Sequence, residues 1–271
     1  MRASLSKLWN EPTLTGESTY FEYERRLGTE VVLPWLERRI DLSGLTIGDF
    51  GCHQGGVLDA LRGDGRARGG IGFDANAANL AASPFEPDER FALEQRDLLT
   101  LSPGEYRFDL ILLSDVLEHV REPELMMRIA RDNLAPDGRV LVTFPPYWSP
   151  FGGHQQLASN WVRLTPYVHY LPDSALFKLA KLGDTNYMKR DDAIADMRDV
   201  RRTRLTLRKA ERAFAEAGLR VAASELFLLR PEYSVRYSLR PRTNRLLGAV
   251  PALREIVTMG AYYLLADGRP A

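Results

Sequence analysis

Cysteine is almost absent from this sequence, in which Cys52 is the only one among 271 residues. A single thiol cannot form an internal disulfide, which excludes a disulfide-stabilised scaffold of the secreted kind. The sequence also lacks any apolar run near the ~20 residues that a membrane-spanning helix needs. Residues 1–10 contain neither the apolar core nor the small-residue cleavage site of a secretory signal. These absences predict a cytoplasmic protein without a membrane span.

An excess of charge of either sign is missing as well. The chain has 36 Lys plus Arg and 36 Asp plus Glu, which gives a net charge of zero and a pI of about 6.9. Nucleic-acid-binding domains usually present a basic surface, so we predict no nucleic-acid partner. The composition, 45% hydrophobic and 27% charged, is ordinary for a globular protein. The length leaves room for one large α/β domain or two small ones.

Strand-like and helix-like segments alternate between residues 45 and 144. The short apolar runs predict strands, and the segments between them predict helices. The predicted strands are 45–50, 69–74, 91–95, 108–113 and 139–144, and the predicted helices are 55–61, 76–82 and 123–134. Such alternation favours βαβ units and a doubly wound (Rossmann-like) α/β fold, in which ligands bind at the carboxyl ends of the parallel strands.

The residues on either side of this alternation predict three further parts. Residues 1–44 form an N-terminal helical cap, with a helix at 20–40, and residues 45–271 form the main domain. Within that domain, 145–203 breaks the alternation with five prolines and many aromatics. A long irregular stretch of this kind predicts an insertion that shapes a pocket. Regular structure then returns as a helix and two strands, at 206–217, 219–229 and 256–265.

Acidic residues mark the ends of three predicted strands. Asp49 opens Asp49-Phe-Gly-Cys-His-Gln-Gly-Gly56, a glycine turn through which backbone amides can approach a ligand closely. Asp74 follows about twenty residues later, where a carboxylate can accept both hydrogen bonds of a ribose diol. Asp97, after the third strand, can reach an adenine amino group. The plainer alternatives are an ordinary strand-to-helix turn, a helix cap and a loop acid beside Arg96.

Five short motifs lie within the alternating strands and helices of residues 45–144. The most specific are Val116-Leu-Glu-His-Val120 after the fourth strand and Pro136-Asp-Gly138 before the fifth. The others are Asp49-x-Gly-Cys-x-x-Gly55, Gly72-Phe-Asp74 and Arg96-Asp-Leu98. Together they resemble the class I S-adenosylmethionine-dependent methyltransferases, most closely the small-molecule branch with the ubiquinone-type O-methyltransferases. The resemblance implies a seven-stranded, mostly parallel sheet with an antiparallel last strand and an insertion after strand five.

The resemblance also implies which residues bind the cofactor, S-adenosylmethionine. The loop from Asp49 to Gly55 would hold the methionine moiety, Asp74 the ribose, and Asp97 with Leu98 the adenine. Ser114 and Asp115 would flank the methionine end and the transferred methyl group. The predicted cofactor-binding residues are Asp49, Gly51, Cys52, His53, Gly55, Asp74, Ala75, Asp97, Leu98, Ser114 and Asp115.

The implied reaction is methyl transfer to a small-molecule acceptor, preferably at a hydroxyl oxygen, by in-line displacement at the methyl carbon. Deprotonating a hydroxyl group near neutral pH calls for a base such as histidine. His154 and His169 lie among aromatic residues of the insertion, so each is a candidate catalytic base, and a hydrogen-bonded loop histidine is the alternative for each. The insertion aromatics Tyr147, Trp148, Phe151 and Trp161 are expected to wall the pocket, and Tyr20 and Tyr23 to cover the cofactor.

Several questions stay open at this point. The acceptor could be a sugar, a quinone, a polyketide or a lipid, the methylated atom could be oxygen, nitrogen or carbon, and the assembly could be a homodimer. His53 stands where the family usually has glycine, which makes a non-catalytic cofactor-binding or scaffold protein the alternative function. No G-x-G-x-x-G supports a nicotinamide-dependent oxidoreductase.

No metal is predicted from the sequence. Glu118, His119, His154 and His169 have the right chemistry for a divalent ion, and some RNA-end methyltransferases of this class use a Glu/His cluster. Nothing in the local spacing of these residues requires an ion.

Overall fold

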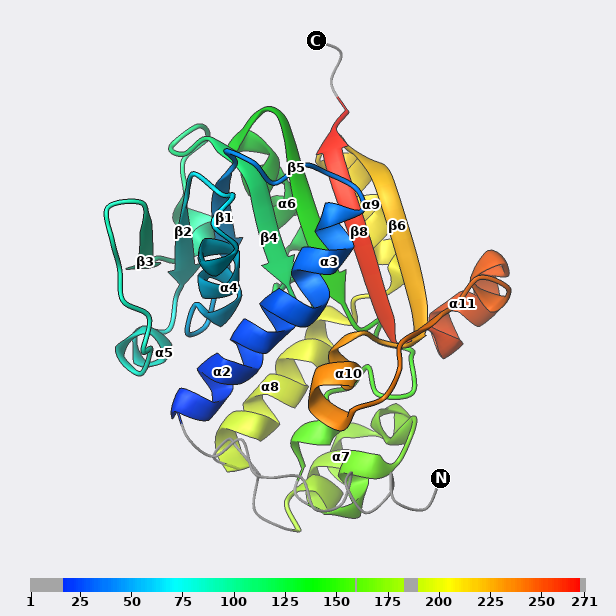
Figure 1. The fold of residues 1–271 in the computed structure, drawn as a ribbon. Helices are drawn as coiled ribbons and strands as arrows, with labels where there is room; N and C mark the ends of the chain where they lie inside the picture. Colours follow the sequence, from blue (N-terminus) through cyan, green and yellow to red (C-terminus); the bar gives the residue numbers. More distant parts are fainter. Residues whose placement is uncertain (1–16, 159, 183–189, 269–271) are drawn as a thin grey trace.

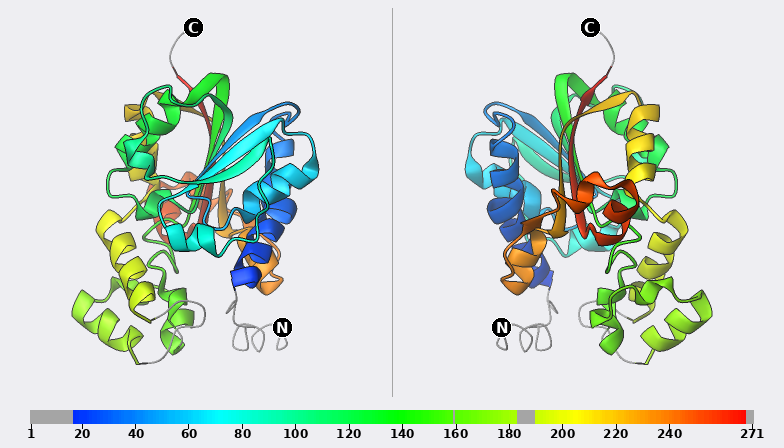
Figure 2. Two further views of the ribbon diagram at one scale, coloured as in Figure 1. Left: turned by 90° about the vertical axis from the view of Figure 1, so that its left-hand side faces the viewer. Right: turned by 90° about the vertical axis from the view of Figure 1, so that its right-hand side faces the viewer.

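The computed structural model describes residues 17–158, 160–182 and 190–268, which form an eight-stranded sheet with helices on both sides (Figures 1 and 2). The strand order is β3-β2-β1-β4-β5-β8-β6-β7. The strands are β1 Thr46–Phe50, β2 Gly69–Asp74, β3 Phe91–Gln95, β4 Phe108–Ser114, β5 Leu134–Phe144, β6 Leu219–Leu229, β7 Arg242–Thr243 and β8 Gly260–Asp267.

The pairing of the strands confirms the predicted mostly parallel α/β sheet. Strands β1 to β5 pair in parallel, and β8 lies antiparallel between β5 and β6. The predicted count of seven strands is wrong, because the two-residue β7 adds to the edge of the sheet beside β6. A strand of two residues is too short to show any alternation of apolar and polar positions.

The last strand begins later than predicted, at Gly260 instead of residue 256. The preceding residues form the helix α11 (Pro251–Val257), with Pro251 in its first turn. Proline is favoured there because its fixed φ suits a helix and its missing N–H would have no intrahelical partner. The buried run that follows is confirmed as a strand, and its residues from Gly260 to Ala266 are all buried.

Helices cover both faces of the sheet (Figure 2). On one face lie α2 (Glu17–Leu27), α3 (Leu33–Glu37) and α4 (Gly56–Asp64), and on the other lie α6 (Pro123–Asp132) and α9 (Leu207–Glu216). The short α5 (Ala77–Ala81) follows β2.

The predicted N-terminal helix is continuous through Pro34. A π-helical turn at Gly28–Val32 joins α2 to α3, and Pro34 lies in the first turn of α3. Proline is tolerated at the start of a helix.

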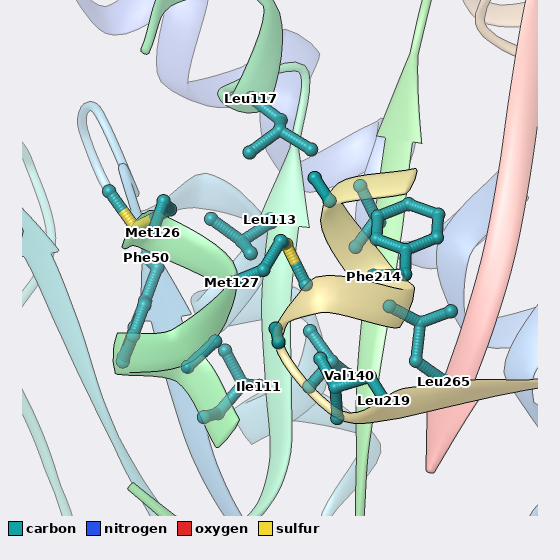
Figure 3. Packing of buried hydrophobic residues seen from close by; sticks show 14 of the residues in the cluster. Phe50, Ile111, Leu113, Leu117, Met126, Met127, Val140, Phe214, Leu219 and Leu265 are labelled. Carbon is teal, nitrogen blue, oxygen red and sulfur yellow. The ribbon is translucent and has the colours of Figure 1, made fainter. Parts of the chain in front are cut away.

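The core on one side of the sheet is built around β4 (Figure 3). Met127 of α6 and Phe214 of α9 pack with Ile111 and Leu113 of β4, and all four side chains are fully buried. The alternating residue Leu112 belongs to the cluster on the opposite face. The uninterrupted apolar run of β4 therefore reflects burial on both faces, as expected for a central parallel strand.

The insertion lies at the carboxyl end of the parallel strands. It contains α7 (Asp173–Ala180) and α8 (Arg190–Thr203), and α10 (Glu232–Tyr237) follows β6 nearby. In Figure 1 the arrow of β4 points toward α8 and α10. The insertion has its own hydrophobic cluster, in which Leu176 and Met197 are fully buried. Its position places it over the edge of the sheet where ligands are expected.

Gly28 sets the distance between the N-terminal helical segment and α4. A Cβ built on Gly28 would lie 2.4 Å from Cβ of Ala60 and 3.2 Å from the carbonyl oxygen of Val57, both in α4. We expect Gly28→Ala to lower the free energy of unfolding by about 1–3 kcal/mol through overpacking. Gly63, also in α4, has nothing within 4 Å of an added Cβ, so Gly63→Ala should raise it by up to ~1 kcal/mol. Urea denaturation measures both, and equal effects would contradict the packing argument.

Candidate active site

A cavity of about 1480 Å³ lies at the carboxyl edge of the sheet. Its walls include Asp49, Asp74 and Ser114 at the ends of β1, β2 and β4, together with parts of α2, the insertion and α10. Small-molecule sites usually measure about 300–1,000 Å³. The cavity is therefore large enough for two ligands at once.

The glycine turn after β1 forms one end of the cavity. Gly51 and Gly55 have φ angles of 80° and 82°, in the left-handed region that favours glycine. A Cβ on Gly51 would also lie 2.5 Å from a methyl group of Val116. The amides of Gly51 and Cys52 donate to the carbonyl oxygen of Phe73, at 2.8 and 2.9 Å, which ties the turn to β2. Backbone from this turn is thereby held at the cavity wall.

Asp74 holds the glycine turn after β1 in place through hydrogen bonds. Its Oδ2 accepts a hydrogen bond from the backbone amide of His53 at 2.9 Å. Its Oδ1 accepts from the amide of Asn76 at 2.8 Å and from the side chain of Asn79 at 3.3 Å. Asp74 therefore joins the loops after β1 and β2 while it also lines the cavity, whereas the cap of α5 is Asn76, whose side chain accepts from the amide of Ala78 at 3.0 Å.

His53 replaces the expected glycine at a position that has kept a glycine-like backbone. Its φ is 51°, and its ring packs against Tyr20 of α2, with ring centroids 4.3 Å apart. Nδ1 of His53 lies 3.8 Å from Oε1 of Glu24. Burial lowers the pKa of His53 below its usual value. The imidazole is thus held against α2, whose Tyr20 and Tyr23 also line the cavity.

Two buried acids, Asp49 and Glu24, lie at this end of the cavity. Asp49 is 3% exposed, and its Oδ2 has no hydrogen-bond partner among the described residues. Burial, and next the charge of Asp74, raise the pKa of Asp49 to about 7. Burial, and next the charge of Asp49, raise the pKa of Glu24 well above its usual range. A cationic group placed between these carboxyls would stabilise their ionised forms.

Asp115 lines the cavity in a strained conformation. Its φ is 55°, and such a left-handed backbone costs a non-glycine residue about 1–3 kcal/mol. Its amide donates to the carbonyl of Thr143 at 2.9 Å, and its carboxylate pairs with Arg230 at 2.5 Å. Arg230 also binds Glu232 at 2.8 Å, and Glu232 accepts from the hydroxyl of Tyr262 at 2.7 Å. This network fixes Asp115 from β5, from Arg230 directly after β6 and, through Glu232, from β8.

Two histidines and two acids meet at the insertion end of the cavity. Asp196 of α8 lies 2.9 Å from Nδ1 of His154 and 3.2 Å from Nδ1 of His119. Glu118 is 1% exposed, and its Oε1 lies 3.8 Å from Nε2 of His154. Burial, and next the charge of Asp115, raise the pKa of Glu118 well above its usual range. His119, His154 and Asp196 line the cavity.

His169, the other predicted base, is not brought to this cavity. It is fully buried, does not line the cavity, and donates from Nε2 to the carbonyl oxygen of Tyr147 at 2.8 Å. Burial lowers the pKa of His169 to about 4. A Cβ on Gly153 would lie 2.1 Å from Cβ of His169. His169 therefore packs beneath the turn that carries His154, and we do not retain it as a candidate base.

The structure divides the predicted cofactor residues into two groups. Seven line the cavity, namely Asp49, Gly51, Cys52, His53, Asp74, Ser114 and Asp115. Gly55, Ala75, Asp97 and Leu98 do not line it. The carboxylate of Asp97 accepts from the amide of Leu99 at 3.0 Å, and Leu98 is 7% exposed in the core. A contact of Asp97 and Leu98 with adenine stays a prediction.

Only part of the predicted aromatic wall is found. Phe151 lines the cavity, whereas Tyr147, Trp148 and Trp161 do not. Trp148 and Trp161 are 36% and 48% exposed on the surface, and Tyr147 is buried.

Several other residues that line the cavity were not predicted from the sequence. Arg230 and Glu232 flank Pro231 directly after β6, so the rule that found Asp49 and Asp74 at strand ends could have found them. Glu24 and Asp196 lie within helices rich in charge, where no local pattern distinguishes them from surface residues. Their burial at the cavity depends on how distant helices pack.

Comparison with known proteins identifies the family. A family described as "Methyltransferase domain" matches residues 22–224. The chain is similar to the ubiquinone biosynthesis O-methyltransferase of Coxiella burnetii (strain Dugway 5J108-111), with 27% identity over 111 residues that cover 41% of this chain and 47% of that protein. The chain thus spans about half the length of the curated relatives that it matches.

Solved structures share the fold. An S-adenosylmethionine dependent methyltransferase from Mesorhizobium loti is 20% identical with a TM-score of 0.52, over 86% of this chain and 96% of that one. The plantazolicin methyltransferase BpumL in complex with SAH is 13% identical with a TM-score of 0.56, over 99% and 95%. Among the described residues, no helix combines the length and hydrophobicity needed to cross a membrane. Because the family match spans 203 of the 271 residues, the chain belongs to the class I S-adenosylmethionine-dependent methyltransferases.

Proposed function

We propose that this protein transfers a methyl group from S-adenosylmethionine to a hydroxyl oxygen of a small-molecule acceptor. The observation that carries the proposal is one cavity that joins the glycine turn after β1 to His154 in the insertion. Its volume of about 1480 Å³ leaves room for cofactor and acceptor together. Holding two reactants in a fixed orientation supplies a large part of the rate of such a transfer.

The residues at the turn end fit the cofactor. Asp49 Oδ2 and Ser114 Oγ are buried atoms that lack a hydrogen-bond partner in the described parts of the chain, and both residues line the cavity. Asp49, with Glu24 beside it, can accept from the amino group of the methionine moiety. Asp74 keeps lone pairs on both oxygens with which to accept from ribose hydroxyls. When bound, S-adenosylmethionine supplies an electrophilic methyl group on a sulfonium.

The residues at the insertion end suit an organic acceptor. Phe151, Leu157 and Leu164 supply apolar surface beside His154. The carboxylate of Asp196 accepts the hydrogen of Nδ1 of His154, so Nε2 keeps its lone pair. An Nε2 in this state can accept a hydrogen bond from an acceptor hydroxyl group, so His154 remains the candidate base.

Calorimetry and product analysis test the proposal. Purified protein is titrated with S-adenosylhomocysteine (SAH), and then incubated with S-adenosylmethionine and a panel of hydroxylated sugars, quinols, polyketides and lipids. We expect stoichiometric SAH binding, and SAH formation that matches a product heavier by one methylene. Binding with turnover only on amine acceptors would move the methylated atom to nitrogen. Folded protein that binds no SAH would overturn the proposal.

His53→Gly tests the non-catalytic alternative. Because the imidazole packs against Tyr20 and the turn already has a glycine-like backbone, wild-type protein should bind SAH. The substitution removes one ring contact of about 1 kcal/mol, so we expect it to change the SAH affinity by less than about fivefold. SAH binding that appears only in His53→Gly would favour a protein that has lost cofactor binding.

A further inference from the structure

The group at the insertion end of the cavity contains an unsatisfied carboxylate. Glu118 follows β4, is 1% exposed, and neither of its carboxylate oxygens has a hydrogen-bond partner among the described residues. Arg230, the positive side chain of the neighbouring network, is already shared between Asp115 and Glu232. A buried carboxylate without a donor is costly, and buried charges are normally paired or bound to a metal. The site therefore requires a cation or a proton at Glu118.

Two imidazoles face the same point. One oxygen of Glu118 and one nitrogen each of His119 and His154 lie within 4.8 Å of one another. Nε2 of His154 is 3.8 Å from Oε1 of Glu118. Because Nδ1 of His154 donates its hydrogen to Asp196, Nε2 of His154 and Oε1 of Glu118 are both acceptors. Two acceptors attract each other only when a cation or a proton lies between them. Ligands of a tetrahedral ion lie about 3.3 Å apart, so small side-chain rotations would close the group around one ion.

Asp196 supplies a second, independent feature of a metal site. Its two carboxylate oxygens lie 2.9 and 3.2 Å from Nδ1 of His154 and His119. Histidine ligands of metals commonly donate their other ring N–H to a carboxylate, which fixes the tautomer and aims the remaining nitrogen at the ion. One carboxylate thus orients both rings, from α8, a different element from those that carry Glu118 and the histidines.

We propose that Glu118, His119 and His154 bind a divalent transition-metal ion of the Zn²⁺ or Co²⁺ kind at the acceptor end of the cavity, with Asp196 as a positioning residue. Two imidazoles with one carboxylate suit borderline ions better than Ca²⁺ or Mg²⁺, which prefer oxygen ligands. Three protein ligands leave at least one coordination position for an acceptor oxygen.

The role of the ion rests on the proposed methyl transfer. An acceptor hydroxyl group bound to the ion would lose its proton to water more readily. The oxygen would then form the C–O bond as the C–S bond of the cofactor breaks, with the electron pair left on the sulfur of SAH. With the ion bound, His154 would act as a metal ligand, and water would take the proton that His154 accepts in the absence of an ion.

Metal titration tests the site separately from activity. Chelator-treated full-length protein is titrated with CoCl₂ while the visible absorption of Co²⁺ and the heat are recorded. We expect one Co²⁺ per chain, displaced by Zn²⁺, which binds such ligands more tightly than Co²⁺. Glu118→Gln and Asp196→Asn should weaken binding by about 10- to 100-fold or more. His53→Asn changes a histidine outside the Glu118, His119 and His154 group, so it should leave the Co²⁺ affinity unchanged.

The outcomes separate this inference from the proposed function. Co²⁺ should raise the melting temperature of the wild type more than that of Glu118→Gln, and circular dichroism verifies that each variant is folded. Wild-type protein that binds SAH without saturable Co²⁺ binding would overturn the metal site alone. Co²⁺ binding that Glu118→Gln does not weaken would also overturn it. Co²⁺ binding without SAH binding would overturn the proposed methyl transfer and keep the site.

Discussion

Asp74→Ala is expected to weaken SAH binding by at least about 100-fold. The substitution removes the acceptor of three hydrogen bonds, from His53, Asn76 and Asn79, that hold the two loops of the cofactor end together. Hydrogen bonds to a charged group contribute roughly 1.5–3 kcal/mol each. Losing the two hydrogen bonds that Asp74 is proposed to accept from the ribose hydroxyls costs about 3 kcal/mol or more, which corresponds to about 100-fold in affinity. Calorimetric titration with SAH measures the change.

Asp88→Ala is the matched control. The carboxylate of Asp88 also accepts hydrogen bonds from two backbone amides, those of Arg90 and Phe91, at 2.7 and 2.8 Å. Asp88 does not line the cavity. Its removal should destabilise a loop but leave SAH affinity within about twofold of the wild type. Equal losses in both variants would mean that loop stability, and not a position at the cofactor, explains the effect of Asp74→Ala.

The features predicted correctly are those that neighbouring residues determine. The apolar run at 108–113 predicted a central strand, because burial on both faces leaves no place for polar alternation. Asp49 and Asp74 could be grouped from the sequence, because parallel strands of one sheet end at the same edge, but Asp97, grouped with them by the same argument, does not line the cavity. The two-residue β7 and the helix α11 were missed, because short segments show too little periodicity.

The features that could not be predicted depend on distant contacts. His154 and His169 are equivalent in the sequence, since both lie near aromatic residues in the insertion. The chain then packs His169 under the turn at Gly153 and leaves His154 at the cavity. Asp196 reaches both cavity histidines only because α8 packs against the turn after β4. No local spacing encodes that contact, so the sequence could name Glu118, His119 and His154 as candidate ligands but could not show that they lie together.

SAH affinity is expected to rise about 10- to 30-fold between about pH 5.5 and 7.5, mainly because of Asp49. Burial and the charge of Asp74 raise the pKa of Asp49 to about 7, whereas an unfolded chain ionises near ~3.9. The contribution of Asp49 to the stability of the free protein is therefore present below about pH 4 and lost as the pH rises through about 7. The cationic amino group of SAH favours the ionised carboxylate, so binding should expel its proton.

Calorimetry in two buffers of different ionisation enthalpy, at about pH 6, measures this proton. We expect the release of close to one proton per SAH in the wild type, and a much smaller release in Asp49→Asn, whose affinity should also depend little on pH. Glu24 faces the same space and also has a pKa above its usual range, so Glu24→Gln serves as the control for a second titrating carboxyl. An affinity that stays constant with pH in the wild type would contradict the assignment of the amino group to Asp49. A pH dependence that persists in Asp49→Asn and disappears in Glu24→Gln would assign the amino group of SAH to Glu24. Burial raises the pKa of either acid, but only the carboxylate that contacts the amino group is stabilised in its ionised form when SAH binds.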